Sequence, residues 1–307
     1  MTAGRSCPLS YRYGPAVFNR PASVDTDTLY VVGGLYGNVA ALATVVAMFE
    51  AEPGRKHLIF NGDFNWFNVD DDSFQRINET VLSFDATRGN VETELDPGGE
   101  ADADTGCGCS YPDWVDDATV HRSNTIIARL AATAARFPLI RQKLLALPMH
   151  RRIDVAGVAV GVVHGDPESL AGWGFAAETL REPATQQQAR TWFDDAGVRI
   201  FASSHTCSPI LLSLADSAGR ECVIANNGAA GMPNFVGRPE GLLTRISCHP
   251  SRSATASATT CVGDLIVEAL PIRYDLKQAQ QAFLREWPPG SAAHISYWQR
   301  IAGATVC

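Results

Sequence analysis

Four polar side chains stand at the ends of short apolar runs or in glycine turns, and their types are those of metal ligands. They are Asp63 in FNGDFNW, Asn90 in RGNVETE, His164 in VVHGDP and His205 in SSHTC. One carboxylate, one amide oxygen and two imidazoles suit Mn, Fe or Zn better than Ca or Mg. A single histidine after a strand is more often structural than a ligand. The prediction of a metal site therefore rests on all four residues together.

The elements that must position these residues alternate along the chain. Strand-like apolar runs occur at residues 29–32, 57–60, 158–163 and 198–202, and a helical pattern covers residues 40–51. The first half alternates strand with helix, whereas the second half is strand after strand. This order is typical of two packed sheets with helices outside, and such folds place their chemistry at the carboxyl ends of strands.

The motifs GLYGN, NGDFNWFN, GNVE, VVHGD and SHTC follow one another in a recognisable order. The chain thereby resembles the calcineurin-like metallophosphoesterase superfamily, whose motifs are D-x-H-G-N, G-D, G-N-H-D/E, a histidine after a strand, and G-H-x-H. NNGAAGMPNF also resembles the N-P-G-S turn of that superfamily. The resemblance implies an α/β fold, a four-layer α/β/β/α sandwich of two mixed sheets. We expect a domain over residues 25–275 with an inserted loop and helical cap at about 96–148, and a C-terminal helical extension over 276–307.

The resemblance also implies which residues hold metal. Asp63 matches the aspartate that bridges two ions, and Asn90, His164 and His205 match the rest of the second-ion pocket. All four ligands of this pocket are present, so one retained divalent or trivalent ion (Mn, Fe or Zn) is expected.

The first-ion pocket departs from the family pattern. Its aspartate falls on Gly34, its first histidine on Tyr36 and its last histidine on Cys207. The histidine that usually protonates the leaving group falls on Val91. Because these losses gather on one side, the sequence indicates a single-ion site or a rebuilt neighbour, and a second ion is left open.

The resulting hypothesis is a metal-dependent phosphoesterase-like hydrolase, a phosphatase in which water on the retained metal attacks a phosphate ester. It gives catalytic roles to Tyr36, Asp63, Asn90, His164 and Arg122, and it counts Cys207 with Asp63, Asn90, His164 and His205 as candidate metal ligands. Loss of the imidazole at Val91 removes general-acid help of typically ~10²–10⁴-fold. An activated ester or diester is therefore a better candidate substrate than an alkyl monoester.

Two alternatives stay open. In the first, the chain is a non-catalytic pseudo-phosphoesterase that binds partners. In the second, Cys107 and Cys109 of GCGCSYPDWV join Cys207 as thiolates that rebuild the first-ion site or carry out a different reaction. Tyr36 is either a phenolate ligand or a gate over the pocket, and Arg122 either grips an anion or serves the structure.

Aromatic residues lie near several site motifs. Trp66, Phe67, Trp114 and Trp173 could form an apolar wall for an aromatic or nucleobase group, although ordinary core packing is the simpler interpretation.

Composition narrows the partners and the compartment. The net charge of −8 argues against non-specific binding to nucleic acid or an acidic membrane, but it allows a small phosphorylated or other anionic substrate beside a metal ion. The first residues form no signal-like apolar run, and the longest apolar stretch, residues 155–163, is too short to span a bilayer. The eight scattered cysteines show no zinc-ribbon spacing. A cytoplasmic protein with reduced thiols is expected.

Overall fold

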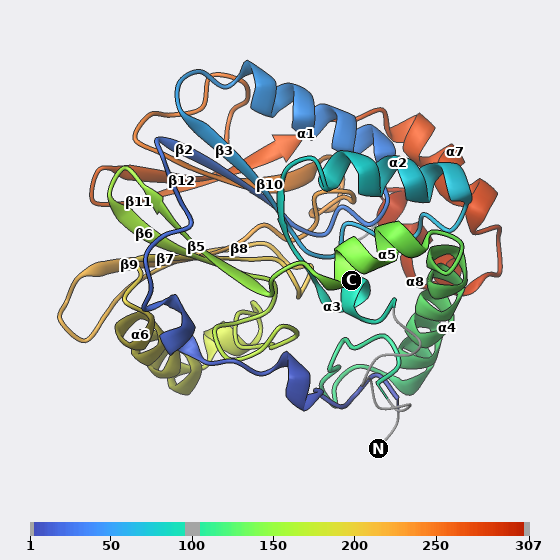
Figure 1. Ribbon diagram of the computed structural model, residues 1–307, viewed down its shortest axis with the longest axis horizontal. Coiled ribbons are helices and arrows are strands. Elements are labelled where there is room, and N and C mark those ends of the chain that lie inside the picture. The colour runs from blue at the N-terminus through green and yellow to red at the C-terminus, as the bar shows by residue number, and fades with distance from the viewer. Residues whose placement is uncertain (1–2, 96–104, 304–307) are drawn as a thin grey trace.

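The computed structural model describes residues 3–95 and 105–303. Two six-stranded sheets face each other, and helices cover their outer faces (Figure 1). The predicted sandwich of two mixed sheets between helices is confirmed.

The first sheet joins three parallel strands to three antiparallel ones. Its order is β11 (Ala258–Val262), β12 (Leu265–Ile272), β10 (Gly241–Ser247), β2 (Thr28–Val32), β3 (Lys56–Asn61) and β4 (Asp85–Thr87). β2, β3 and β4 run parallel, and β10 is antiparallel to both β2 and β12.

The second sheet is mixed as well. Its order is β1 (Val24–Thr26), β5 (His150–Val155), β6 (Val158–Val163), β7 (Ile200–Ser203), β9 (Glu221–Asn226) and β8 (Ile210–Ala215). β6, β7 and β9 are parallel to one another, so their carboxyl ends lie on one edge.

Strand β2 shows how the sequence fixes the layers. All five of its residues are buried, as expected for a strand with both faces covered. Leu29 and Val31 pack into the core between the sheets, whereas Tyr30 and Val32 pack against the helical side. This alternation follows from the two-residue period of a strand.

The helices gather in two groups. On the side of the first sheet lie α1 (Val39–Ala51), α2 (Asp71–Val81) and α7 (Leu276–Glu286), and α6 (Pro183–Ala196) covers the second sheet (Figure 1). The short α3 (Asn90–Thr93), together with α4 (Asp117–Ala134), α5 (Pro138–Leu145) and α8 (Ala292–Ile301), lies at one end of the sandwich. Short 3-10 turns at Leu9–Tyr11, Pro15–Phe18 and Thr179–Arg181 complete the elements of the described ranges.

Helix starts follow from capping side chains. Asn38, Asp70, Asp116 and Asp275 each accept a hydrogen bond from a backbone N–H three residues on. Such caps satisfy the free N–H groups of a first turn and stabilise it by about 1 kcal/mol.

Most sequence expectations agree with these elements. The strands expected at 57–60, 158–163 and 198–202 correspond to β3, β6 and β7, and the expected helix at 40–51 corresponds to α1. Of the expected long loop, residues 96–104 lie outside the described residues, while 105–116 form an irregular segment before α4. The division into domain, cap and extension stays a prediction. In the described ranges no helix is both long and apolar enough to cross a membrane.

Candidate metal centre

Four strand ends deliver the candidate ligands to one place. Asp63 follows β3, Asn90 begins α3 after β4, His164 comes directly after β6, and His205 follows β7. Each sheet therefore contributes two of the four residues, and the cluster lies where the carboxyl ends of both sheets meet.

Three of the four side chains converge on one ring nitrogen of the fourth, His164. His164 Nε2 lies 3.3 Å from Asp63 Oδ2, 3.2 Å from Asn90 Oδ1 and 3.3 Å from His205 Nδ1. The ligand atoms of Asp63, His164 and His205 all lie within 4.8 Å of one another. None of the four residues is more than 6% exposed, so bulk water does not separate them.

Hydrogen bonds to the backbone orient each ring and amide. His164 Nδ1 lies 3.0 Å from the carbonyl oxygen of Asn61, and His205 Nε2 lies 3.2 Å from that of Cys109. The amide nitrogen of Asn90 donates to another carbonyl of the loop that contains Cys109. When both imidazoles are neutral and carry their protons on these nitrogens, the remaining nitrogen and oxygen lone pairs face one another. Four converging acceptors fit a cation, and backbone-oriented imidazoles are typical of metal ligands.

The charges in the cluster are strongly coupled. Burial alone would raise the pKa of Asp63, but the neighbouring His164 and then His205 outweigh it and lower that pKa. Burial opposes protonation of His164, yet the Asp63 carboxylate raises its pKa above the usual value. Burial and then the charge of His164 lower the pKa of His205 to about 3. His205 therefore stays neutral, which a histidine ligand requires.

Glu92 holds the loops that carry the cluster. It is fully buried and accepts hydrogen bonds from the backbone N–H groups of Asp63 (2.8 Å), Gly89 (3.0 Å) and Asn65 (3.1 Å). A Cβ at position 89 would lie 2.2 Å from Asp63 Oδ1, so glycine is required there. Burial, followed by the Asp63 charge, raises the pKa of Glu92. Glu92 thus positions Asp63, and its oxygens face the backbone.

The first-ion side is filled by Tyr36 and Cys207. The Tyr36 hydroxyl lies 2.6 Å from Cys207 Sγ, and a Cβ on Gly34 would lie 2.9 Å from the Tyr36 ring and 3.0 Å from its hydroxyl. The phenol therefore occupies the space into which a side chain at position 34 would project. Burial raises the pKa of both Tyr36 and Cys207, which keeps the phenol and the thiol protonated. The gate and ligand interpretations of Tyr36 both stay predictions.

Three site residues share an unusual backbone conformation. Tyr36, Asp63 and Cys207 have φ of +53°, +53° and +56°, which is the left-handed region that side chains other than glycine rarely adopt. Such conformations cost of order 1–3 kcal/mol each and tend to gather at functional sites.

The thiols do not form a metal site. Cys107 and Cys109 are buried in the loop beside the cluster, but their carbonyl oxygens face Asn90 and His205. Among residues 3–95 and 105–303, the only group of three His, Cys, Asp or Glu close enough to share an ion is Asp63 with His164 and His205. This arrangement does not favour the alternative in which three cysteines rebuild the first-ion site. Cys207 does not join the ligand group, because its thiol faces the Tyr36 phenol.

Arg122 is placed away from the cluster. Its Nε donates to Ser296 Oγ at 2.7 Å and its Nη2 to Thr119 Oγ1 at 2.8 Å. The Ser296 bond joins α4 to α8 and the Thr119 bond lies within α4, which favours the structural interpretation of Arg122 over the anion-gripping one. Asp166, next to a ligand in the sequence, instead accepts from backbone N–H groups of the following turn.

Two further side chains lie beside the cluster: Arg300, which no sequence motif indicated, and Trp173, one of the aromatic residues noted near the site motifs. Arg300 in α8 donates to the carbonyl oxygens of Cys207 (3.0 Å) and Pro233 (2.7 Å). The Trp173 ring lies edge-on to His205, with centroids 5.6 Å apart, and its indole N–H donates to Cys109 O. Trp114, which is exposed, packs against Trp173 at 6.2 Å.

Comparison with known proteins supports the fold. No family model matches the chain, and no curated protein is found as a relative. A metallophosphoesterase from Sphaerobacter thermophilus is similar in structure, with 18% identity and a TM-score of 0.52, over 90% of this chain and 99% of that one. The hypothetical protein PH1004 from Pyrococcus horikoshii is similar with 13% identity and a TM-score of 0.56, over 88% and 97%. With two mixed sheets between helices and the motifs in order along the strand ends, the chain has the calcineurin-like metallophosphoesterase fold.

Proposed function

We propose that the chain hydrolyses a phosphate ester with one ion held by Asp63, Asn90, His164 and His205. The observation that carries this proposal is the convergence of three ligand atoms within 3.3 Å of His164 Nε2, in a buried setting. An ion bound there would act as a Lewis acid on a phosphoryl oxygen and lower the pKa of water toward ~7. Mn, Fe or Zn suits the donor set best.

The chain's own residues determine how this site differs from a two-ion site. Asp63 supplies the single carboxylate, and its second oxygen accepts from the backbone N–H of Val91 at 3.2 Å. Tyr36 stands on the first-ion side as a neutral phenol, able to donate a hydrogen bond toward a phosphoryl oxygen but unable to supply a positive charge. Val91 cannot protonate a leaving group. Esters with good leaving groups, such as aryl phosphodiesters, are therefore the expected substrates.

A second candidate function is supported by the burial of the cluster. Loop carbonyls at Cys107 and Cys109 contact Asn90 and His205, and the four cluster residues have little exposed surface. A non-catalytic ion-binding module would fit this covered arrangement. Catalysis requires that the loop give way when substrate arrives.

Metal analysis combined with an activity assay separates the two functions. Protein purified without added ions is analysed for metals and then assayed on bis(4-nitrophenyl) phosphate. We expect about one ion per chain and measurable hydrolysis, with both lost in His164→Gln and both retained in His121→Gln, an exposed histidine on α4. A bound ion without hydrolysis of any aryl ester would refute the hydrolase and favour the binding module.

A further inference from the structure

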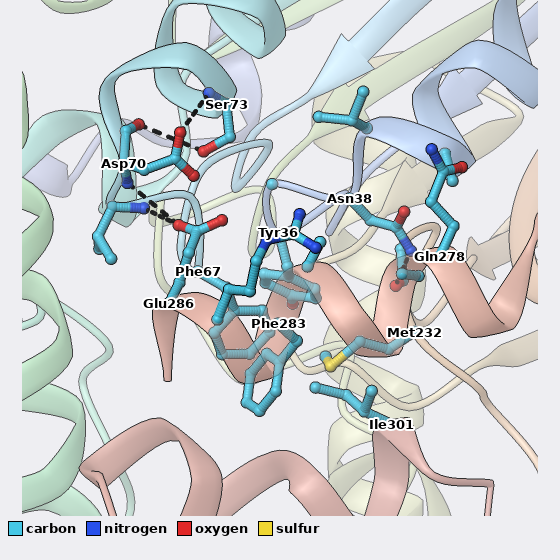
Figure 2. A pocket seen from close by; sticks show the side chains of 18 of the residues that line it. Tyr36, Asn38, Phe67, Asp70, Ser73, Met232, Gln278, Phe283, Glu286 and Ile301 are labelled. Atoms are coloured by element: carbon cyan, nitrogen blue, oxygen red, sulfur yellow. Dashed lines mark hydrogen bonds between the residues drawn. The ribbon is translucent and has the colours of Figure 1, made fainter. Parts of the chain in front are cut away.

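A cavity of about 600 Å³ is formed by the N-terminal ends of α1 and α2 and by one face of α7 (Figure 2). This volume lies within the usual range for small-molecule pockets. None of the four cluster residues lines the cavity. It is therefore a second concave site, distinct from the candidate metal centre.

One part of the cavity is apolar. Phe67, Met232, Phe283 and Ile301 line it there, and Figure 2 shows Met232 and Ile301 well apart from Asp70. The rings of Phe67 and Phe283 meet edge to face, with centroids 5.1 Å apart. Aromatic rings and methionine sulfur both pack favourably against a further ring. This part of the cavity therefore suits the apolar or aromatic portion of a ligand.

Three arginines of the lining have no partner for their charge. Arg76 on α2, Arg129 on α4 and Arg285 on α7 all line the cavity and are exposed. Within residues 3–95 and 105–303, none of these three guanidinium groups forms a hydrogen bond or an ion pair. Arg129 packs over the ring of Trp287, 4.5 Å from its centroid, which positions this group. Asp72 lies four residues before Arg76 on α2, yet no ion pair joins the two.

The acidic groups of the lining do not neutralise these cations. Asp70 accepts from the backbone N–H of Ser73 as the cap of α2. Glu286 accepts from the backbone N–H groups of Val69 and Asp70 (Figure 2), and burial followed by Asp70 raises its pKa to about 8. Glu286 is therefore mostly uncharged at neutral pH. The two carboxylates of Asp70 and Asp72 then face three guanidinium groups, so the lining is net positive although the chain carries a net charge of −8.

This combination selects the chemistry of a ligand. A guanidinium group is a planar fork of N–H donors that matches a carboxylate, a sulfonate or a phosphate. A neutral ligand would leave this donor capacity unused, and a highly charged one would meet Asp70 and Asp72. A surplus of one positive charge beside an apolar surface therefore complements a molecule with one negative group and an apolar body.

We propose that this cavity binds a small, soluble amphipathic anion, whose negative group is held by Arg76 and Arg285 and whose apolar body packs against Phe283. The proposal goes beyond the hydrolase function and does not depend on it, because the cavity shares none of the four cluster residues.

Two probes that differ only in the charged group test the proposal. Naphthalene-2-sulfonate and 2-naphthol carry the same ring system, and both are titrated calorimetrically into the full chain. The protein is treated with a chelator first, because an ion at the cluster would itself attract the sulfonate. Wild type should bind the sulfonate more tightly than 2-naphthol by about tenfold. Equal affinities, or no binding of the sulfonate, would overturn the proposal.

Arginine variants locate the charge that the sulfonate meets. Arg285→Gln and Arg76→Gln should each weaken sulfonate binding by about tenfold and leave 2-naphthol binding little changed. Arg181→Gln is the matched control, because Arg181 is exposed but lies outside the lining. Wild-type affinity for the sulfonate in both cavity variants would refute the assignment of the anion to this site.

Filling the cavity from α7 locates the apolar body. Ala282 lines the cavity, whereas the adjacent Gln281 is exposed and does not. Ala282→Phe should weaken sulfonate binding by about tenfold, while Gln281→Phe should leave it unchanged. Ala279→Leu, at another lining position of α7, serves if the larger residue impairs folding. Unchanged sulfonate affinity in both filled variants would show that the probe binds outside the cavity.

Discussion

The four-residue cluster makes a quantitative prediction for thermal stability. An ion that binds only the folded chain adds about 2.7 kcal/mol to the free energy of unfolding when its free concentration is about 100 times its Kd. For a chain of 307 residues, the unfolding entropy is about 0.6 kcal/mol/K at roughly 2.1 cal/mol/K per residue. The melting temperature should therefore rise by about 4 °C on saturation with Mn or Zn.

Replacing His164 tests whether this shift comes from the cluster. His164 Nε2 is the atom on which the other three ligands converge, so His164→Gln should reduce the metal-induced shift to less than about 1 °C. The variant is also expected to melt lower without metal, since the buried ring loses its bond to Asn61 O. Each protein is therefore compared with its own chelator-treated sample, by circular dichroism.

An exposed histidine supplies the control. His121→Gln on α4 should keep the full shift of about 4 °C, since that side chain is exposed and outside the cluster. A full shift in His164→Gln, or an equal loss in both variants, would show that the ion binds elsewhere. The ligand assignment would then be wrong.

Three further predictions concern groups around the site and in the core. Burial and then Asp70 raise the pKa of Glu286 from 4.5 to about 8. Between these pH values the folded chain keeps a proton that the unfolded chain releases. The free energy of unfolding should therefore fall as the pH rises through this range. Glu286→Gln should remove this fall, of at most about 1.4 kcal/mol per pH unit, in urea unfolding followed across that range. Gly34→Ala should lower the free energy of unfolding by about 1–3 kcal/mol, because φ is +66° and the new Cβ would meet the Tyr36 ring. Gly54 has a φ of +78° but open space around it, so Gly54→Ala should cost less in the same denaturant titration. Arg245→Leu should cost about 3–5 kcal/mol, because buried Glu52 and Glu268 lose their shared partner. Arg55→Leu, whose partners Asp25 and Asp27 are more than half exposed, should shift the urea midpoint little.

Much of the candidate site could be predicted because its residues follow strands directly. Asp63, His164 and His205 each come within a few residues of a buried apolar run, and parallel strands bring their carboxyl ends to one edge. The local sequence therefore indicates both which residue could bind metal and that this residue lies at the carboxyl end of a strand. The same reasoning identified β3, β6 and α1 within one or two residues.

Other parts depend on contacts that no local pattern encodes. Arg300 lies 93 residues from Cys207, whose carbonyl it binds, and only the packing of α8 brings them together. The short strands β1 and β4 have three residues each, too few to show a period. Arg122 has the right chemistry for an anion, but its position on α4 turns it toward Ser296.

The altered residues of the first-ion side are physically dependent on one another. The Tyr36 ring occupies the space that a side chain at position 34 would fill. Glycine at position 34 removes a family ligand, and it also makes room for the Tyr36 ring. The Tyr36 hydroxyl in turn meets the Cys207 thiol, where an imidazole would be bulkier. Independent decay of a two-ion site would be expected to leave mismatched contacts, but these three residues pack as a unit beside an intact ligand set. This packing supports the proposal that the chain binds one ion beside a neutral phenol.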